Sequence, residues 1–339
     1  MDPGAGRRTV EVACDESGFV GGSLFGDATV FAHASVQVGA AESVELLEEV
    51  RRRTGAGPGE VKASRLRHPS TRPVAAWLSG PEGPLGARAV VHVTDTRLFG
   101  LARLAQLLTS ASLPEGWWSA DHDAGAWALA QRLDVLASGL PTTEERRFLH
   151  GARDLLWLNR RLRPRAPVES WTDTVADVAG RLEHDDRGVV AALGSAAALA
   201  RVSDYLDTPP ATPLTEPILP ALRWAVHHWS ALGDPDVVHD EQSALTPGRV
   251  GALAADLAAT YPGRRLAGFA RVDSRDDPRV QVADLLAGVV RRTVAARLAG
   301  GTTGWAGLSV DHLVADASPL GRPVPVSRGV TAALVERTD

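Results

Sequence analysis

Alternating apolar and polar positions near the start of the chain predict a β-strand that ends on acidic residues. In the run VEVACDESG, Val10, Val12 and Cys14 fall on one face of a strand, while Ala13 and Asp15 fall on the other. Gly18 permits a sharp exit from the strand. The pattern holds the Asp15 carboxylate at the C-terminal end of a strand, and open α/β sheets bind ligands at that edge.

Further runs of apolar residues predict four more strands and three more helices. The strands are expected over residues 28–38, 88–95, 236–241 and 266–272, with a hairpin at Gly26-Asp27 before the first of them. Helices are expected over residues 44–53 and 250–260, and from Pro278 to Leu298 with Asp277 as N-cap. A short helix near residues 308–315 is a weaker expectation.

The middle of the chain, residues 96–232, has a nearly continuous helical pattern without a convincing strand. We therefore expect an α/β fold whose core combines residues 1–95 and 235–339, interrupted by an all-helical insertion over residues 96–234. Seven of the nine tryptophans lie in this insertion. Such residues are typical of a core, but they also suit an interface with a protein partner or a second copy of the chain, so both explanations stay open.

Composition narrows the class of protein. The chain has 339 residues, of which 44% are hydrophobic, and a formal net charge of −5, so any nucleic-acid contact requires a local basic patch. A single cysteine, Cys14, excludes an internal disulfide and a zinc site built from several thiolates. The first residues lack the apolar core of a signal peptide, and no run of about 18 uncharged apolar residues follows. We expect a cytoplasmic protein that does not enter a membrane.

Lys62 is the only lysine among 36 basic residues. Ammonium is a compact point charge and guanidinium is a planar fork, so a lone lysine in an arginine-rich chain can mark a position where arginine fails. Chance survival of one lysine under a strong codon bias explains the observation equally well.

Four acids occupy informative positions: Asp15 after the first strand, Glu60 after the first helix, Asp240 near the end of a later strand, and Asp284 within an apolar helix. Parallel strands would bring Asp15 and Asp240 to one edge of a sheet, where a packed helix adds Asp284. Clustered carboxylates select Mg²⁺ or Mn²⁺, and two such ions can clamp the attacking and leaving oxygens of a phosphodiester. Taken singly, each acid also has a structural explanation: a solvated strand end, or for Asp284 an ion pair with Arg271, Arg279 or Arg291.

Four motifs in this chain resemble those of the family known as domain of unknown function 3800. They are Asp15-Glu16-Ser17-Gly18, Glu60-Val61-Lys62, Val238-His239-Asp240-Glu241 and the helical Gln281-Val282-Ala283-Asp284-Leu285-Leu286-Ala287-Gly288. Members of that family are thought to have a ribonuclease H-like fold, a mixed sheet with flanking helices, which implies metal-dependent phosphodiester hydrolysis. The long helical insertion departs from the family pattern.

The resemblance implies a role for each matching residue. Asp15, Glu60, Asp240 and Asp284 would be the metal ligands for one or two Mg²⁺ or Mn²⁺ ions, and Lys62 would orient Glu60 or meet a phosphate. Gln281, one helical turn before Asp284, would contact substrate or an ordered water, although a polar residue in the first turn of a helix explains it equally well. Independently of the resemblance, Arg65, Arg67 and His68 follow Lys62 directly and are placed to meet phosphates near the acids, and Ser17 is a further candidate for substrate binding. Asp95 is a further candidate acid, although a solvated strand end explains it too.

The sequence thus leads to two hypotheses. The first is a metal-dependent nuclease acting on DNA or RNA. The second is a module that keeps the fold but only binds nucleic acid or protein, using the helical insertion to hold a partner.

Overall fold

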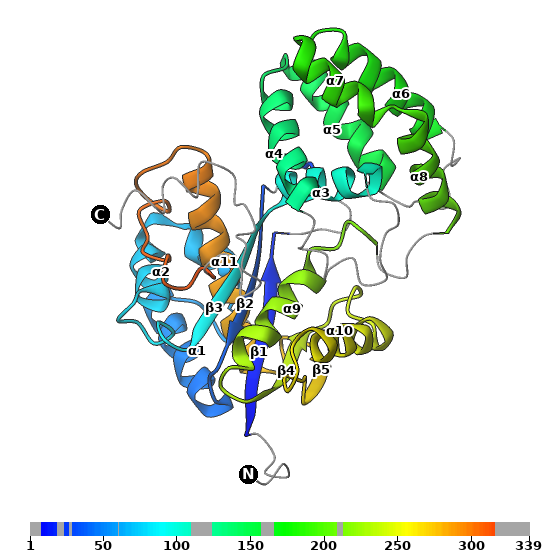
Figure 1. Cartoon of the computed structure of the whole chain (residues 1–339). Helices are drawn as coiled ribbons and strands as arrows, with labels where there is room; N and C mark the ends of the chain where they lie inside the picture. The colour runs from blue at the N-terminus through cyan, green and yellow to red at the C-terminus, as the bar shows by residue number, and fades with distance from the viewer. Residues whose placement is uncertain are drawn as a thin grey trace. The chain divides into compact units, whose positions relative to one another are not determined.

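The computed structural model describes residues 8–18, 24–26, 29–59, 61–109, 124–156, 166–208 and 213–315. The chain divides into two compact units. The first contains residues 1–18, 30–94 and 218–339, and the second contains residues 19–29 and 95–217. The first unit combines a sheet with helices, whereas the described part of the second is helical (Figure 1). The α/β class predicted from the sequence is confirmed.

The described residues of the first unit form a five-stranded mixed sheet in the order β3-β2-β1-β4-β5. Its strands are β1 (Thr9–Ser17), β2 (Val30–Val36), β3 (Ala89–Asp95), β4 (Asp234–Asp240) and β5 (Gly268–Val272). β1 pairs antiparallel with β2 and parallel with β4, and β4 pairs parallel with β5. Gln37 N–H, just after β2, donates to Arg88 O, just before β3, so these two strands are also antiparallel.

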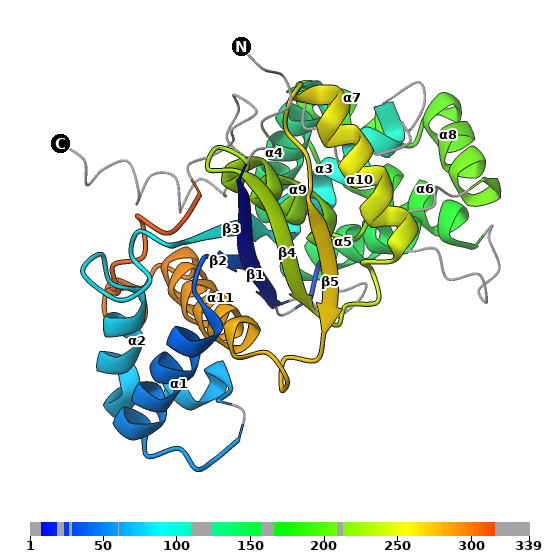
Figure 2. The same cartoon turned by 90° about the horizontal axis from the view of Figure 1, so that it is seen from below.

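One face of the sheet is covered by α11 (Pro278–Leu298), which packs across β1 and β2. α1 (Ala40–Thr54) and α2 (Arg72–Ser79) pack on α11 in turn, as Figure 2 shows. The buried side chains between sheet and helix are small and branched, which suits close helix-on-sheet packing. They include Ala13, Ala34, Val36, Val282 and Leu286.

The opposite face of the sheet is covered by α9 (Ile218–Trp229), and α10 (Pro247–Thr260) connects β4 to β5. The Trp229 indole N–H donates to the Ser35 hydroxyl of β2 at 2.8 Å. From the sequence, α9 was grouped with the helical insertion. Here it belongs to the first unit, because its apolar side covers the sheet. Periodicity identifies a helix but not the unit against which it packs.

Most predicted elements appear with small shifts in their ends. The strand expected over residues 28–38 is β2, the helix expected over residues 44–53 is α1, and the Asp277 side chain accepts a hydrogen bond from Arg279 N–H as the N-cap of α11. The short helix expected near residues 308–315 is wrong. That segment forms turns, and Val314 bridges to Val91 of β3, where pairing with an open strand edge satisfies its backbone.

The second unit contains six helices within the described residues. They are α3 (Thr96–Thr109), α4 (Ala124–Ser138), α5 (Thr142–Leu156), α6 (Ala166–Ala179), α7 (His184–Leu193) and α8 (Ala196–Asp207). α3 packs against α4, α5 and α8, and α6 packs against α5 and α7. Trp171 is fully buried and its indole N–H donates to Leu193 O, so this tryptophan is a core residue. Trp117, Trp118 and Trp157 lie outside the described residues.

One stretch among the described residues, Asp186–Asp207, is long and apolar enough to cross a membrane by length and composition alone. This is weak evidence, because core helices of other proteins pass the same test. The stretch includes most of α7 and all of α8, with a break between the two helices at Gly194 and Ser195.

Candidate functional site

Two carboxylates lie near the C-terminal ends of neighbouring parallel strands, at the same edge of the sheet. Cys14 of β1 and His239 of β4 are partners in the parallel register, so the next residues, Asp15 and Asp240, are adjacent. Both carboxylates lie on the face that α11 covers, because Ala13 and Val238, two residues earlier, pack into the core beneath that helix. The alternation predicted for the first strand is confirmed.

α11 supplies the third carboxylate. Asp284 is half-buried on a helix that packs on β1, and its charge acts on Asp15. Asp15 itself is 5% exposed. Burial raises its pKa well above the usual value, and the charges of Glu16, Asp284 and Asp240 raise it further. Three acids predicted from separate parts of the sequence therefore meet, and they meet as a mutually repulsive group.

Hydrogen bonds position two of these carboxylates. Asp15 Oδ1 accepts from Glu16 N–H at 2.7 Å, and Asp240 Oδ1 accepts from Ser274 N–H at 2.9 Å. Ser274 follows β5, so the loop after the edge strand fixes the Asp240 side chain. Each of these hydrogen bonds uses only one of the several acceptor positions of a carboxylate. The two groups are thus oriented while retaining acceptor capacity.

Gln281 lies one helical turn before Asp284, on the same side of α11. Its side chain is 7% exposed, and its buried Oε1 has no hydrogen-bond partner among the described residues. A buried amide oxygen without a donor is costly, so such an atom indicates a missing ligand or water. This observation agrees with the expectation that Gln281 contacts substrate or ordered water.

The remaining predicted residues have different outcomes. Glu60 lies outside the described residues. Lys62 is exposed at the start of the 3₁₀ turn η1 (Ala63–Arg67). Arg275 lowers the pKa of Asp273, and the charge of Lys62 lowers it further, so the lysine acts near the loop that follows β5. Arg65 is exposed on the same turn. The Ser17 hydroxyl accepts from Arg291 Nε at 3.1 Å and is therefore used within the protein.

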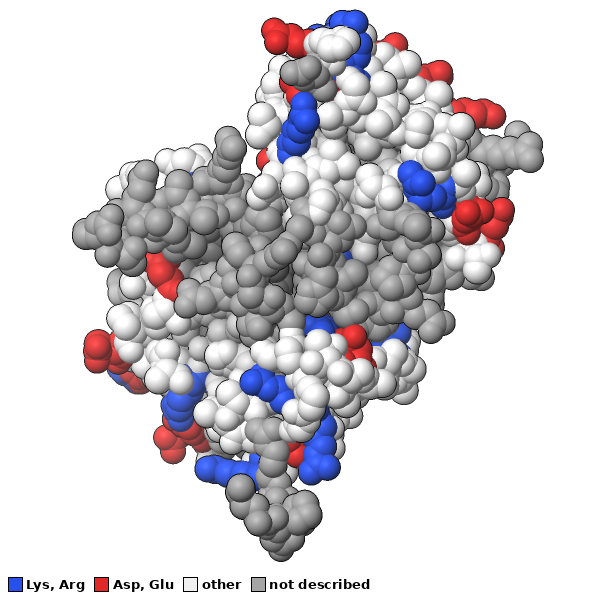
Figure 3. All heavy atoms as spheres, in the orientation of Figure 1, with Lys and Arg blue, Asp and Glu red and all other residues white. Residues whose placement is uncertain are grey.

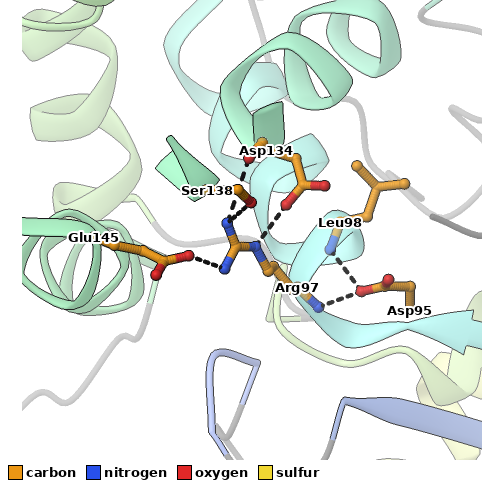
Figure 4. Close-up of polar contacts among 6 residues, drawn as sticks. All are labelled: Asp95, Arg97, Leu98, Asp134, Ser138 and Glu145. Atoms are coloured by element: carbon orange, nitrogen blue, oxygen red, sulfur yellow. Dashed lines mark hydrogen bonds and ion pairs between the residues drawn. The ribbon is translucent and has the colours of Figure 1, made fainter. Parts of the chain in front are cut away.

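Asp95 has a structural role within the second unit (Figure 4). Its Oδ1 accepts from the backbone N–H groups of Arg97 and Leu98 at 2.9 and 3.0 Å, which caps the start of α3. The sequence could not separate this role from that of a further metal ligand, since an acid after a strand and before a helix suits both.

A second polar cluster lies on the opposite face of the sheet and was not expected. Glu16 and His33 are direct partners across β1 and β2, and His33 Nε2 lies 3.1 Å from His239 Nε2. Glu16 Oε1 accepts from Gln242 Nε2 at 2.6 Å. His239 Nδ1 donates to the carbonyl oxygen of Asp240 at 3.0 Å, because a carbonyl oxygen can only accept. The two acids of the Asp-Glu-Ser-Gly motif thus serve opposite faces.

A hollow of about 580 Å³ opens at the ends of β4 and β5. It is lined by Glu241, Gln242, Ser243 and Arg271. Both signs of charge line this space, so its walls favour neither an anion nor a cation. Charges of both signs are also interspersed over the described surface in the view of Figure 3. In the second unit, Arg147 pairs with Asp177 and Arg153 pairs with Asp154.

The described residues, which omit Glu60, contain no group of three or more His, Cys, Asp or Glu side chains already drawn together tightly enough to hold a metal ion. Like-charged carboxylates repel one another, so without a cation the three acids have no reason to close to coordination distance. The oxygen-only donor set nevertheless matches the preference of Mg²⁺ and Mn²⁺.

Comparison with family models, with curated proteins and with solved structures finds no match to this chain. Its function is therefore inferred from its own residues and their geometry.

Proposed function

We propose that this chain is a divalent-metal-dependent nuclease that hydrolyses phosphodiester bonds in DNA or RNA. The single observation that carries the proposal is the convergence of Asp15, Asp240 and Asp284 at one edge of the sheet. A protein does not gather a buried carboxylate and two further acids for stability, because burial and repulsion both disfavour the charged forms. The arrangement is explained if a cation joins them.

The fold supports the same proposal. We infer a ribonuclease H-like core, in which the acidic strand β1 lies at the centre, antiparallel β2 and β3 lie on one side, and parallel β4 and β5 lie on the other. In this arrangement the end of β1 meets the end of its parallel neighbour β4. Ligands of α/β sheets bind at this kind of edge.

Asp15, Asp240 and Asp284 would hold Mg²⁺ or Mn²⁺, with Glu60 as a fourth ligand. The bound ion would supply charge neutralisation and Lewis-acid activation at the phosphodiester. In the hydrolysis itself, a water oxygen forms a bond to phosphorus, the P–O bond to the leaving oxygen breaks, and that oxygen takes up a proton.

The protein's own groups would position the reactants. Gln281 has an unused amide oxygen on the side of α11 that carries Asp284, which suits an acceptor for a substrate hydroxyl or for a water. Asp15 accepts from Glu16 N–H and Asp240 accepts from Ser274 N–H, so one oxygen of each carboxylate is already oriented by the backbone.

The test is cleavage of labelled single- and double-stranded DNA and RNA in Mg²⁺ or Mn²⁺. We expect cleavage to disappear with EDTA, and to fall at least about 100-fold in Asp15→Asn and Asp284→Asn, the size of effect that follows loss of one positioned electrostatic group. Glu45→Gln, at an exposed position on α1, is the matched control and should cleave normally. Metal-dependent cleavage that persists in Asp15→Asn would refute the assignment.

The competing hypothesis is a module that binds without cleaving. It predicts that calorimetry finds no binding of Mg²⁺ or Mn²⁺ to the intact chain, and that no nucleic acid is cleaved under any condition tested. The gathering of Asp15, Asp240 and Asp284 favours the nuclease, because a module that only binds has no need of mutually repelling carboxylates.

A further inference from the structure

Three arginines of η1 and α11 lie near enough for their charges to act on one another, and Arg291 contacts the end of β1. Arg67 comes from η1, and Arg291 and Arg292 come from α11; we call them the arginine triad. Arg291 Nε donates to Ser17 Oγ at 3.1 Å, and Arg292 Nη1 donates to Ala63 O at 2.5 Å. The Arg292 guanidinium also lies over the Trp305 ring, 5.6 Å from its centre. Arg67 is exposed, and its side chain has no hydrogen bond among the described residues.

No ion pair between a triad arginine and a carboxylate is found within the described residues. Elsewhere, Arg88 contacts Glu42 and Arg279 contacts Asp277. Burial together with the charges of Arg291 and Arg67 lowers the pKa of Arg292 to about 10, against a smaller opposing effect of Asp284. Burial and the charge of Arg67 also lower the pKa of Arg291. Three cations held together at this cost indicate that an anion belongs between them.

The triad lies beside the acids. Ser17 follows Asp15 on the same face of β1, two residues or roughly 7 Å further along the strand. On α11, Arg291 follows Asp284 by seven residues, which is two helical turns or roughly 10 Å. The side chains of Asp284 and Arg291 therefore point from the same side of the helix toward the same strand. At this spacing, a single polyanionic strand could contact both the three acids and the arginine triad.

Two glycines of the sequence motifs make this arrangement possible. Gly18 has a φ of +97°, and a Cβ at this position would stand 2.3 Å from Arg291 Cδ. A Cβ at Gly288 would stand 2.3 Å from the Ala63 Cβ at the start of η1. The first glycine admits Arg291 to the end of β1. The second lets the turn that carries Arg67 lie directly on α11.

We propose that the arginine triad binds a backbone phosphate of a nucleic-acid strand whose neighbouring phosphodiester lies at Asp15, Asp240 and Asp284. This inference rests on the proposed nuclease function and adds the substrate contact that sets the register of the strand. Arg67 and Arg291 carry guanidinium N–H groups beyond those used within the protein, and guanidinium matches phosphate geometry in a bidentate manner. Arg292, which is bound to Ala63 O, contributes charge and holds η1 in place.

The test is binding of a short fluorescein-labelled single strand, DNA or RNA, to the full chain in EDTA, measured by anisotropy between about 50 and 200 mM salt. Arg67→Gln should weaken binding about 10-fold at low salt and reduce the slope of log K against log salt by roughly 0.7, which corresponds to one lost phosphate contact. Arg67→Lys should retain most of the salt slope. Arg52→Gln, an exposed arginine paired with Glu49 on α1, is the matched control and should change neither quantity.

Since Arg67 is exposed, its variants should fold normally, and Arg291→Gln provides a second, independent reduction of the slope. Unchanged affinity and slope in Arg67→Gln and Arg291→Gln would overturn the inference. An equal loss of strand affinity in Arg52→Gln would also overturn it. So would displacement of the strand by inorganic phosphate at concentrations that show the site to bind free phosphate as tightly as the strand. Binding without cleavage would contradict the proposed nuclease and leave the phosphate site in place, because the EDTA assay requires neither metal nor catalysis.

Discussion

Gly288 of α11 and Ala63 of η1 approach so closely that a Cβ on the glycine would lie 2.3 Å from the alanine methyl. Two-thirds of the chain separates these residues, and each belongs to or adjoins a sequence motif. Their contact joins the helix that carries Asp284 to the turn that follows Lys62 and carries Arg67. The distance between Asp284 and Arg67 therefore depends on residue 288 being a glycine, which has no Cβ.

Gly288→Ala should displace η1 from α11. Because the added methyl meets another Cβ rather than the end of a flexible side chain, we expect a loss of about 1–3 kcal/mol in the free energy of unfolding. Strand binding should weaken with it. Gly251→Ala is the matched control, since this glycine within α10 has no atom within 4 Å of the built Cβ, and the change should stabilise by about 0.5–1 kcal/mol. Equal effects of the two changes in denaturant unfolding would contradict the account.

Asp15→Asn should stabilise the metal-free protein at pH 7. Burial and neighbouring acids raise the pKa of Asp15, so the folded state holds this proton more tightly than the unfolded chain does. Asp15 therefore disfavours folding above its unfolded pKa of about 4, and the penalty grows until pH passes the folded pKa. Each unit by which the pKa is raised corresponds to about 1.4 kcal/mol.

Thermal unfolding in EDTA from about pH 5 to pH 7 tests this linkage. The stability difference between Asp15→Asn and wild type should widen as pH rises above the unfolded pKa of about 4, and it should level off once pH exceeds the folded pKa of Asp15. Saturating Mn²⁺ should reverse the order, because only the wild type gains binding energy, about 2.7 kcal/mol when the ion is at 100 times its dissociation constant. A variant that is no more stable than wild type at pH 7 in EDTA would show that burial and the neighbouring acids do not raise the pKa of Asp15.

Arg97 should be a major stabilising residue of the second unit. Its guanidinium contacts Asp134 of α4 at 2.6 Å and Glu145 of α5 at 2.5 Å, and a further nitrogen donates to Ser138 (Figure 4). Burial alone would lower the pKa of Arg97, but the bonds to Glu145 and Asp134 outweigh it and raise the pKa. One side chain thereby joins three helices.

We expect Arg97→Met to lower the free energy of unfolding by about 1–3 kcal/mol, less than for a fully buried pair because these groups are about a quarter exposed. Arg147→Met removes an exposed pair with Asp177 and should cost at most about 1 kcal/mol. Urea unfolding measures the loss for both variants. An equal loss in the free energy of unfolding would contradict the claim that the Arg97 network stabilises more than a single exposed ion pair.

Periodicity was sufficient for the strands, for α1 and for α11, because their apolar faces are long and their caps are local. It was sufficient also for Asp15, Asp240 and Asp284, since acids at strand ends and within an apolar helix are visible in the sequence. The cluster of Glu16, His33 and His239 was not predictable. It depends on strand pairing between distant segments, and the alternation that directs Asp15 to one face sends Glu16 to the other.

Two further features depended on tertiary contact. The Ile218–Trp229 helix was placed with the wrong segment because its amphipathic pattern does not state which surface it covers. Ser17 accepts a hydrogen bond from Arg291, 274 residues later in the chain, a contact that the sequence did not predict. That contact places Arg291 near the acids. From the sequence, only the basic residues just after Lys62 could be predicted to lie near them.

The central claim is that Asp15, Asp240 and Asp284 share a divalent ion, and an anomalous difference map from crystals of the full chain soaked in Mn²⁺ tests it most directly. The account predicts a manganese peak within roughly 2.0–2.6 Å of oxygens from both Asp15 and Asp284, with Asp240 on the same ion or on a second ion about 3.5–4 Å away. The peak should vanish in Asp15→Asn crystals treated identically. Saturating Mn²⁺ that gives no peak at these three carboxylates would contradict the account.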